Sequence, residues 1–502
     1  VALLLLAGCL MAAEYSDGRL MLEINLVSDS ELLISMPKGA AEVHVSEMDG
    51  LFSKRMVGNF SINIVNPDAL SYFGVLNYKE MGGTKGADEH AVPREYFAWE
   101  NGNLAIKQEL LYFFPDSYNN REQAEAFADE KGLPHSKIME VQMINSTVRI
   151  TGNRGEVSYL ETPIHISSVS DIKINGSSLG YAGEFVIKTV NRKLVINHLL
   201  PLEDYIAGVV QNEIGNSSPP EALKAQAVAA RTHALSLLLN NRHKADGYDL
   251  CSSTHCQVYR GKHLQNDAIR EAVAATSNEV LFAGTYPADT PYHSSCGGKT
   301  DASSQIWRGK PVEHLNGVTC IAEADEYDLS QETDARAWID TKHDTAEMSS
   351  WERGALAWEK SITKAKLAEN TGLEYVNSIT IIKRGRSGRI LSMKIVGNKT
   401  ISLDNEFKIR QAFGNLYSSF FYIKGSYQEL NGDVIMNPNS TITIKGKGAG
   451  HGIGMCQIGA LRMARLGVAY NDILQHYYPG TTLNSNWMAE ESQYYNEIKY
   501  DE

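Results

Sequence analysis

The chain has 502 residues, of which 43% are apolar, so it can bury a large core. At about 100 to 200 residues per domain, this length predicts two to four domains. The formal net charge of −13 argues against nucleic acid as the main ligand, because contacts with phosphates need a basic surface that no run of Lys or Arg provides.

The first residues, "VALLLLAGC", form an apolar run that is too short to cross a membrane. They resemble the end of a bacterial lipoprotein signal, which is cleaved before a cysteine that then carries a lipid. We therefore interpret residues 1–12 as the remnant of such a signal, with Cys9 as a membrane anchor. The alternative is an ordinary cleaved secretory signal. Both predict an exported protein of the cell envelope.

Residues 13–158 predict a strand-rich N-terminal extension of unknown role, because segments such as "LMLEINLVSDSELLISM" alternate apolar and polar side chains. A short helix is expected within it, over 120–133. Strands continue through 160–200, in what we predict to be a second domain over 159–485. Residues 486–502 read as an acidic tail. The fold class expected for the whole chain is α+β.

Two helices are expected next. "LEDYIAGVVQNEI" (202–214) has apolar residues at helical spacing and stops before Gly215, which places Glu213 at a helix end. "SSPPEALKAQAVAARTHALSLLLNN" then begins with Ser218, which we predict to be the N-cap of a capping box with Glu221. Later helices are expected over 349–372 and 458–468, and near 470–480.

The segment "GKGAGHGIGMCQIGA" (446–460) has a glycine at every second position from 446 to 454. If this segment is extended, one face carries no side chains, and a ligand could lie against the backbone. The alternative is that the glycines permit tight turns and packing around a buried His451. A phosphate-binding loop is disfavoured, because the G-K-[S/T] ending is missing.

Four blocks in order resemble the stage II sporulation protein D family, which includes amidase enhancers. They are 200–235, "YHSSCGGKT" (292–300), "GNLYSSFFYIK" (414–424) and 450–483. The resemblance implies a mixed α/β domain with an active-site groove between the helix end and the glycine-rich segment. It implies a lytic transglycosylase that cuts MurNAc–GlcNAc bonds of denuded peptidoglycan strands and leaves 1,6-anhydroMurNAc ends, with Glu213 as the catalytic residue.

This chemistry is compatible with one catalytic carboxyl group and no cofactor. Ordinary glycosidases need two carboxylates, but the 6-hydroxyl of N-acetylmuramic acid can attack C1 of its own ring. Glu213 would protonate the leaving oxygen and accept the proton of that hydroxyl. By local sequence alone, Glu213 could equally be a solvated glutamate at a helix end.

Further residues in the family blocks are candidates for binding the substrate. Lys224 and Arg231 are seven positions apart and share a helical face, whereas Gln226 and Arg231 do not. Either cation could instead be a surface charge, and His451 could be a structural histidine. Cys456 stands where relatives usually carry serine. The predicted substrate-binding residues are Lys224, Gln226, Arg231, Ser294, Ser295, Gly297, Gly298, Thr300, His451 and Gln457.

A C-x4-C pair made by Cys251 and Cys256 follows His243, and its spacing falls within that of zinc sites. The family resemblance implies that some relatives hold zinc at this location. We predict a structural zinc site formed by these three residues, with His255, Cys296 or water as the fourth ligand. The alternative is a Cys251–Cys256 disulfide, which an oxidising compartment would allow. Cys296 and Cys320 are a second candidate disulfide pair.

Two other functions compete with catalysis. A non-catalytic peptidoglycan-binding protein that stimulates a cell-wall amidase would keep the groove and need no acid. A purely structural envelope lipoprotein would not bind glycan at all.

Overall fold

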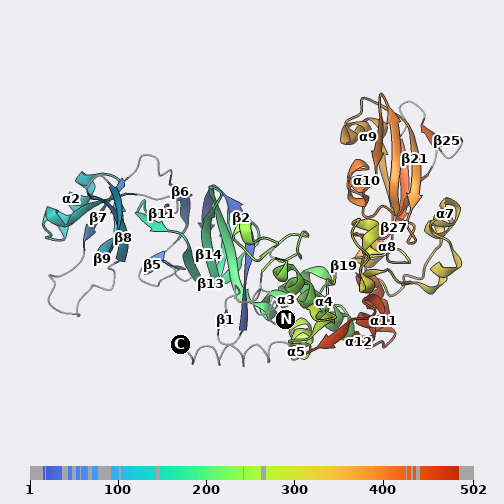
Figure 1. Cartoon of the computed structure of the whole chain (residues 1–502), viewed down its shortest axis with the longest axis horizontal. Coiled ribbons are helices and arrows are strands. Elements are labelled where there is room, and N and C mark those ends of the chain that lie inside the picture. Colours follow the sequence, from blue (N-terminus) through green and yellow to red (C-terminus); the bar gives the residue numbers. More distant parts are fainter. Residues whose placement is uncertain are drawn as a thin grey trace. The chain divides into compact units, whose positions relative to one another are not determined.

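The computed structural model describes most of the chain. The described residues are 15–16, 19–36, 43–47, 53–56, 58–65, 71–76, 92–100, 103–142, 147–240, 242–261, 267–424, 427–430, 433–436 and 441–485. The predicted lipoprotein remnant with Cys9 and the predicted acidic tail lie outside the described residues. The chain divides into two compact units, and each is described by itself. The structure has the expected α+β composition, with a strand-rich N-terminal region (Figure 1).

Unit 2 consists largely of Gly8–Val209 and Leu237–His263. Its main sheet forms because alternating side chains are buried, as in β2, where Leu20, Leu22 and Ile24 face the core. The strands in sheet order are β1 (Tyr15–Ser16), β2 (Arg19–Asp29), β15 (Lys193–Pro201), β14 (Tyr181–Val190), β13 (Ile164–Ile174), β3 (Glu31–Ser35), β6 (Phe60–Ile64), β11 (Thr147–Gly152) and β12 (Val157–Glu161). Three further strands join this sheet outside that order: β4 (Val43–Glu47) pairs with β13, β5 (Ser53–Met56) pairs with β4, and β16 (Leu250–Cys251) pairs with β2. Figure 1 shows β2, β13 and β14 side by side.

The domain boundary predicted between residues 158 and 159 falls inside β12. The sheet continues across it, because β2 pairs with β15 and β3 pairs with β13. The predicted extension therefore shares one sheet with the strands that begin the family domain. A period-2 pattern shows that a segment is a strand but not which strand it pairs with, so the sequence could not reveal this.

A smaller sheet in unit 2 is covered by the helix expected over 120–133. The strands in order are β10 (Ile138–Gln142), β7 (Ser71–Leu76), β9 (Asn103–Tyr118) and β8 (Val92–Glu100). The 3-10 turn η1 (His135–Lys137) directly precedes β10. Helix α2 (Arg121–Glu130) packs Ala124 and Ala128 against Val75 and Ile138. The side chain of Asn120 caps the helix by accepting from Gln123 N at 3.0 Å.

The two helices predicted from the first family block are present as α3 (Leu202–Glu213) and α4 (Pro220–Leu239). Gly215, with φ of +81°, ends the first as expected. The capping box predicted for α4 is wrong. Ser218 Oγ donates to Ile214 O at 2.8 Å and so closes the end of α3. Glu221 instead accepts from Lys224 Nζ at 2.7 Å and from Tyr470 N at 2.9 Å.

Unit 1 consists largely of Val210–Ser236 and Leu264–Glu502. Its core packs the alanine-rich face of α4 against the C-terminal helices and short strands. These elements are α5 (Asp267–Ala275), β17 (Val280–Ala283), β18 (Tyr286–Pro287), β19 (Tyr292–His293), β28 (Met455–Cys456), α11 (Gln457–Arg465), α12 (Tyr470–Tyr477) and β29 (Thr482–Asn484). The helices expected over 458–468 and near 470–480 are thereby confirmed. In the part of the chain that the structure describes, no helix combines the length and apolarity needed to cross a membrane.

The part of unit 1 between β19 and β28 carries two further sheets. In the first, β20 (Ala357–Thr363), β27 (Thr441–Lys447) and β24 (Phe421–Lys424) pair in that order. In the second, the order is β23 (Thr400–Leu403), β22 (Ile390–Gly397), β21 (Val376–Arg384), β26 (Asp433–Met436) and β25 (Tyr427–Leu430). The helices of this part are α6 (Ser303–Ile306), α7 (Glu332–Asp340), α8 (Ser350–Leu356), α9 (Lys364–Thr371) and α10 (Glu406–Ala412), of which α9 and α10 lie beside the second sheet (Figure 1).

The single helix predicted over 349–372 is wrong in its middle. The structure has α8, then β20, then α9 in this stretch. Residues 357–363 form a strand because Trp358 and Ile362 enter the core on one face while the backbone pairs with β27. Tertiary pairing therefore overrides the local helical pattern here.

Candidate functional site

Glu213 lies at the last position of α3 and is half-buried. It lines a cleft of about 600 Å³ in unit 1. The other lining residues come from the end of α3 and the loop after it, from the loop before α8 and the start of that helix, and from α11. They are Gln211, Asn212, Ile214, Gly215, Asn216, Ser217, Ser218, Ala346, Glu347, Met348, Ser349, Trp351, Glu352, Leu461 and Arg465. The predicted catalytic residue thus borders a space large enough for sugar units.

One of the predicted substrate-binding residues, Gln457, is hydrogen-bonded both to this glutamate and to another predicted residue, Gln226. Gln457 Nε2 donates to Glu213 Oε2 at 3.3 Å and to Gln226 Oε1 at 3.3 Å. Gln457 and Gln226 are only 1% and 0% exposed, so they support the carboxyl group from inside the protein. Among the described residues, Gln226 Nε2 has no hydrogen-bond partner. The structure therefore joins the first and last family blocks through one buried amide.

The cleft contains a second carboxylate that the sequence reasoning missed. Glu352 accepts from both terminal nitrogens of Arg465, at 2.7 and 3.0 Å, and from Ser349 N at 2.7 Å. Burial raises the pKa of Glu352, but the hydrogen bonds from Arg465 and Ser349 lower it by more than burial raises it. The pKa of Glu352 therefore lies below its ordinary value. Glu352 is therefore ionised near neutral pH and is not a proton donor. The capping box "SSWE" at the start of α8 could have indicated its position.

Trp351 is another cleft residue that sequence reasoning did not single out. Its side chain is 41% exposed, which is unusual for so large an apolar group. A tryptophan face at a cleft wall offers apolar contact area to a flat ligand, such as a sugar ring, while polar groups fix the orientation of that ligand.

The glycine-rich segment does not form the bare ligand-binding face that we expected. Gly448, Gly450, Gly452 and Gly454 have φ of +79°, +92°, +83° and +69°, so the backbone is not an extended strand there. The space beside each glycine is filled by the protein itself. For example, a Cβ on Gly452 would collide with the guanidinium of Arg389. No described residue of 446–454 lines the cleft at Glu213. In this cleft, residues of α8 and α11 form the wall opposite Glu213.

His451 has the hydrogen bonds expected of a structural histidine, which was the alternative interpretation of the sequence. Its Nε2 donates to Tyr292 O at 3.0 Å and its Nδ1 accepts from Ile453 N at 3.0 Å. Burial, together with the nearby His293 and Arg389, holds the pKa of His451 well below its ordinary value. The ring is therefore neutral and holds the turn of the glycine-rich segment.

Lys224 and Arg231 lie two turns apart on α4 and have different surroundings, since Lys224 is half-buried and Arg231 is buried. Lys224 pairs with Glu221 and lies over the ring of Tyr470, 5.6 Å from its centroid. Arg231 is fully buried, and its guanidinium donates to Glu279 O at 3.1 Å. Neither is among the cleft residues named above. This burial argues against direct contact between Arg231 and a glycan strand.

The predicted residues of 294–300 pack against the glycine-rich segment, and they are not cleft residues either. Ser295 and Ala449 exchange backbone hydrogen bonds of 2.9 and 2.8 Å, and Ser294 O accepts from Ile458 N at 3.0 Å. A Cβ on Gly297 would meet Phe420, and one on Gly298 would meet Trp338. Thr300 Oγ1 accepts from Val318 N at 2.7 Å. Ser294 and Ser295 thus hold the backbone of α11 and of the glycine-rich segment, whereas Gly298 and Thr300 contact Trp338 and Val318.

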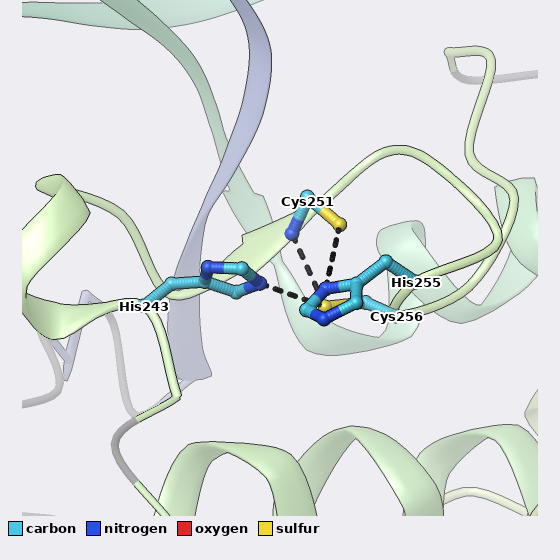
Figure 2. Close-up of side chains that lie close together, drawn as sticks. All are labelled: His243, Cys251, His255 and Cys256. Carbon is cyan, nitrogen blue, oxygen red and sulfur yellow. Dashed lines mark hydrogen bonds between the residues drawn. The ribbon is translucent and has the colours of Figure 1, made fainter.

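The predicted metal ligands lie together in unit 2, with His255 as the fourth donor (Figure 2). One ligand atom from each of His243, Cys251, His255 and Cys256 lies within 4.8 Å of the others. Cys256 Sγ is 3.3 Å from His243 Nε2, and Cys251 Sγ is 3.8 Å from His255 Nδ1. His243 Nδ1 donates to Asp246 Oδ2 at 2.9 Å, which turns the lone pair of Nε2 toward the sulfurs.

Two imidazoles and two thiols match the ligand set of a structural zinc site, and a carboxylate behind a histidine is the usual support for such a ligand. The hydrogen bonds from Cys256, Ser253 and His255 lower the pKa of the Cys251 thiol, which favours the thiolate that a metal requires. All five cysteines in the described part of the chain carry free thiols. The structure therefore contains neither the Cys251–Cys256 nor the Cys296–Cys320 disulfide.

Comparisons with known proteins find sequences that are similar to this chain. The model of a family described as "Stage II sporulation protein" matches residues 190–282, and a domain of unknown function matches residues 301–454. An uncharacterised protein of Brachyspira hyodysenteriae is 31% identical, over 68% of this chain and 83% of its own length. The amidase enhancer of Bacillus subtilis is 31% identical, over 56% of this chain and 40% of its own length. Stage II sporulation protein D of the same organism is 28% identical, over 60% and 78%.

Proposed function

Because this chain belongs to the stage II sporulation protein D family, whose role is related to the cell wall, we propose that it is an exported lytic transglycosylase of peptidoglycan. Its substrate would be the MurNAc–GlcNAc bond of glycan strands without stem peptides, and its product a 1,6-anhydroMurNAc end. The observation that carries this proposal is the hydrogen bond between Glu213, at the edge of the cleft, and Gln457 from the last family block.

In the proposed reaction, Glu213 gives its proton to the glycosidic oxygen as the C1–O bond breaks. The 6-hydroxyl of the same MurNAc ring then forms the new bond to C1, and its proton passes to the Glu213 carboxylate. Glu352 remains ionised in its pair with Arg465, so it takes no proton in either step. Trp351 offers its exposed face to a sugar ring, and Gln457 holds the reacting carboxyl group in place.

The test is incubation of denuded glycan strands with the unmodified chain and with Glu213→Gln. Removing a general acid lowers a rate by about 10²- to 10⁴-fold, so anhydroMurNAc ends, counted by mass spectrometry, should nearly disappear. Glu203→Gln, in the first turn of the same helix, is the matched control and should retain activity. Full activity of Glu213→Gln would refute the assignment of the acid.

The second candidate is a non-catalytic protein that binds peptidoglycan and stimulates a cell-wall amidase. The name of the Bacillus subtilis relative, amidase enhancer, favours it. This function would need the cleft but no acid. It predicts that neither the unmodified chain nor Glu213→Gln releases anhydro ends, that both sediment with glycan strands, and that Trp351→Ala weakens sedimentation.

We further propose that His243, Cys251, Cys256 and His255 hold a structural zinc ion. The N₂S₂ donor set and the carboxylate of Asp246 support this assignment. Protein purified without chelator should contain zinc that is lost in Cys251→Ser. Retention of that zinc by Cys251→Ser, or a disulfide between Cys251 and Cys256 in the purified chain, would refute it.

A lipid anchor on Cys9 is a separate proposal about residues outside the described part. It predicts that, in cells, the chain fractionates with membranes and that Cys9→Ser moves it to the soluble envelope fraction. Membrane retention of the variant would refute the anchor.

A further inference from the structure

Three more cysteines lie together in the core of unit 1, in a group that shares no residue with the proposed zinc site above. The Sγ atoms of Cys296, Cys320 and Cys456 all lie within 4.8 Å of one another. They come from distant segments: one follows β19, one precedes the 3-10 turn η4 (Ala322–Glu326), and one is the N-cap of α11. Only the tertiary fold brings them together, and the proposed reaction uses none of them.

Each of the three sulfurs has at least one hydrogen-bonding neighbour. Cys456 Sγ accepts from the backbone N–H groups of Gly459, at 3.4 Å, and of Cys296, at 3.2 Å. Cys296 Sγ accepts from Gly298 N at 3.3 Å, and Cys320 Sγ lies 2.9 Å from the hydroxyl of Tyr477. Donors aimed at sulfur stabilise thiolates, and the N-terminus of α11 adds its partial positive charge at Cys456. Thiolates are the form that binds a metal.

A candidate fourth ligand lies beside one of these cysteines. His293 pairs in register with Cys456 across the parallel strands β19 and β28. Its Nδ1 faces Ile453 O at 3.1 Å and must therefore carry the proton, which leaves Nε2 with the lone pair. The ring is 4% exposed, and among the described residues Nε2 has no hydrogen-bond partner. A buried imidazole nitrogen without a partner is costly unless something occupies it.

We propose that Cys296, Cys320, Cys456 and His293 form a closed structural zinc site in the core of unit 1. Tetrahedral coordination with Zn–S bonds of about 2.3 Å places sulfurs about 3.8 Å apart, so the thiols need to approach by at most about 1 Å. Binding would release the protons of the protonated thiols to solvent. A disulfide is the rival, but it would use two sulfurs and leave the third sulfur and the lone pair of His293 unexplained.

The position of this site gives it a consequence for the cleft. Cys456 directly precedes Gln457, whose amide bonds Glu213. A metal bound to Cys456 would hold the first turn of α11 and thus the residue that positions the carboxyl group. The zinc site itself does not depend on the proposed function, because its test measures metal and not glycan cleavage.

The test compares the zinc content of the full chain with that of Cys320→Ser/Cys456→Ser. Serine keeps an oxygen acceptor for Gly459 N as the N-cap of α11, so the helix start is preserved. Inductively coupled plasma mass spectrometry should find about one zinc per chain fewer in this variant than in its parent. The same loss should appear when both carry Cys251→Ser, which removes the contribution of unit 2. Equal zinc content in parent and variant would overturn the proposal.

A second measurement needs no variant, so a folding failure cannot obscure the answer. Anomalous scattering at the zinc edge from crystals of the unmodified chain should give a peak between the three sulfurs and His293 Nε2. A bond between any two of Cys296, Cys320 and Cys456, seen by non-reducing peptide mapping, with no zinc peak there, would overturn the proposal.

Discussion

The buried amide of Gln457 allows a test that separates the stability of unit 1 from its chemistry. In Gln457→Met the side chain keeps its length and loses its polar atoms, so the packing changes little. Gln226 then loses the donor to its Oε1, and its Nε2 already has no partner among the described residues. Leaving a buried polar group unpaired costs about 1–3 kcal/mol, and losing the bond to Glu213 adds about 1 kcal/mol. We expect a loss of about 2–4 kcal/mol in the free energy of unfolding.

The double variant Gln226→Met/Gln457→Met should be more stable than Gln457→Met alone by about 1 kcal/mol or more. Replacing both partners of a buried hydrogen bond with apolar groups removes the unpaired atoms instead of creating them. Glycan cleavage should not recover with stability, because the hydrogen bond from residue 457 to Glu213 is still absent. We expect both variants to cleave denuded strands about 10- to 100-fold more slowly than the unmodified chain.

Urea unfolding followed by tryptophan fluorescence measures the stability, since five of the six tryptophans follow residue 300. Release of anhydroMurNAc ends measures the reaction. If the losses of Gln226→Met and Gln457→Met, each measured alone, simply add in the double variant, the two amides are not coupled as the structure indicates. If cleavage returns with stability, Gln457 does not position Glu213.

Two further predictions concern the glycine-rich segment that precedes Gln457 and a histidine, His343, that contacts Lys447 of that segment. Gly452→Ala should destabilise unit 1 by about 2–4 kcal/mol, because it combines a positive φ with a collision with buried Arg389; Gly467→Ala, at a similar φ of +81° in open space, should cost only about 1 kcal/mol in the same urea assay. A small cost of Gly452→Ala would mean that the close packing is not needed. Burial and the charge of Lys447 lower the pKa of His343 to about 4. Between its ordinary pKa of 6.5 and about 4, the unfolded chain binds a proton that the folded chain does not, so stability should fall as the pH decreases through this range. His343→Gln should reduce that fall in thermal unfolding curves, and an unchanged curve would contradict the shift.

The helices that carry the site could be predicted locally. The spacing of Ile206, Val209 and Val210 and the stop at Gly215 place Glu213 at a helix end without reference to the rest of the chain. A helical period of 3.6 residues is a local property, and so is a glycine stop signal. The helix predicted over 349–372 was wrong in its middle because local patterns do not record long-range pairing. The strand in the middle of this stretch depends on pairing with residues 441–447.

The cleft itself could not be predicted in this way. Its wall opposite Glu213 includes Trp351 and Arg465, which are separated from the glutamate by more than a hundred residues. The composition of the glycine-rich segment predicts a ligand surface, because the glycines have no side chains. Composition does not show, however, which other residues fill the space beside the glycines. The structure places Arg389 and His293 there.

The sequence by itself determined the α+β class, the family, the helix end that carries Glu213 and the spacing of Cys251 and Cys256, since each depends on residues close together in the chain or on recognisable blocks. Only the tertiary structure decided that Gln457 bonds Glu213, that Glu352 is held by Arg465, and that three distant cysteines meet. Contacts of this kind depend on how separate elements pack, and packing selects partners by shape and by unpaired polar groups across the whole core.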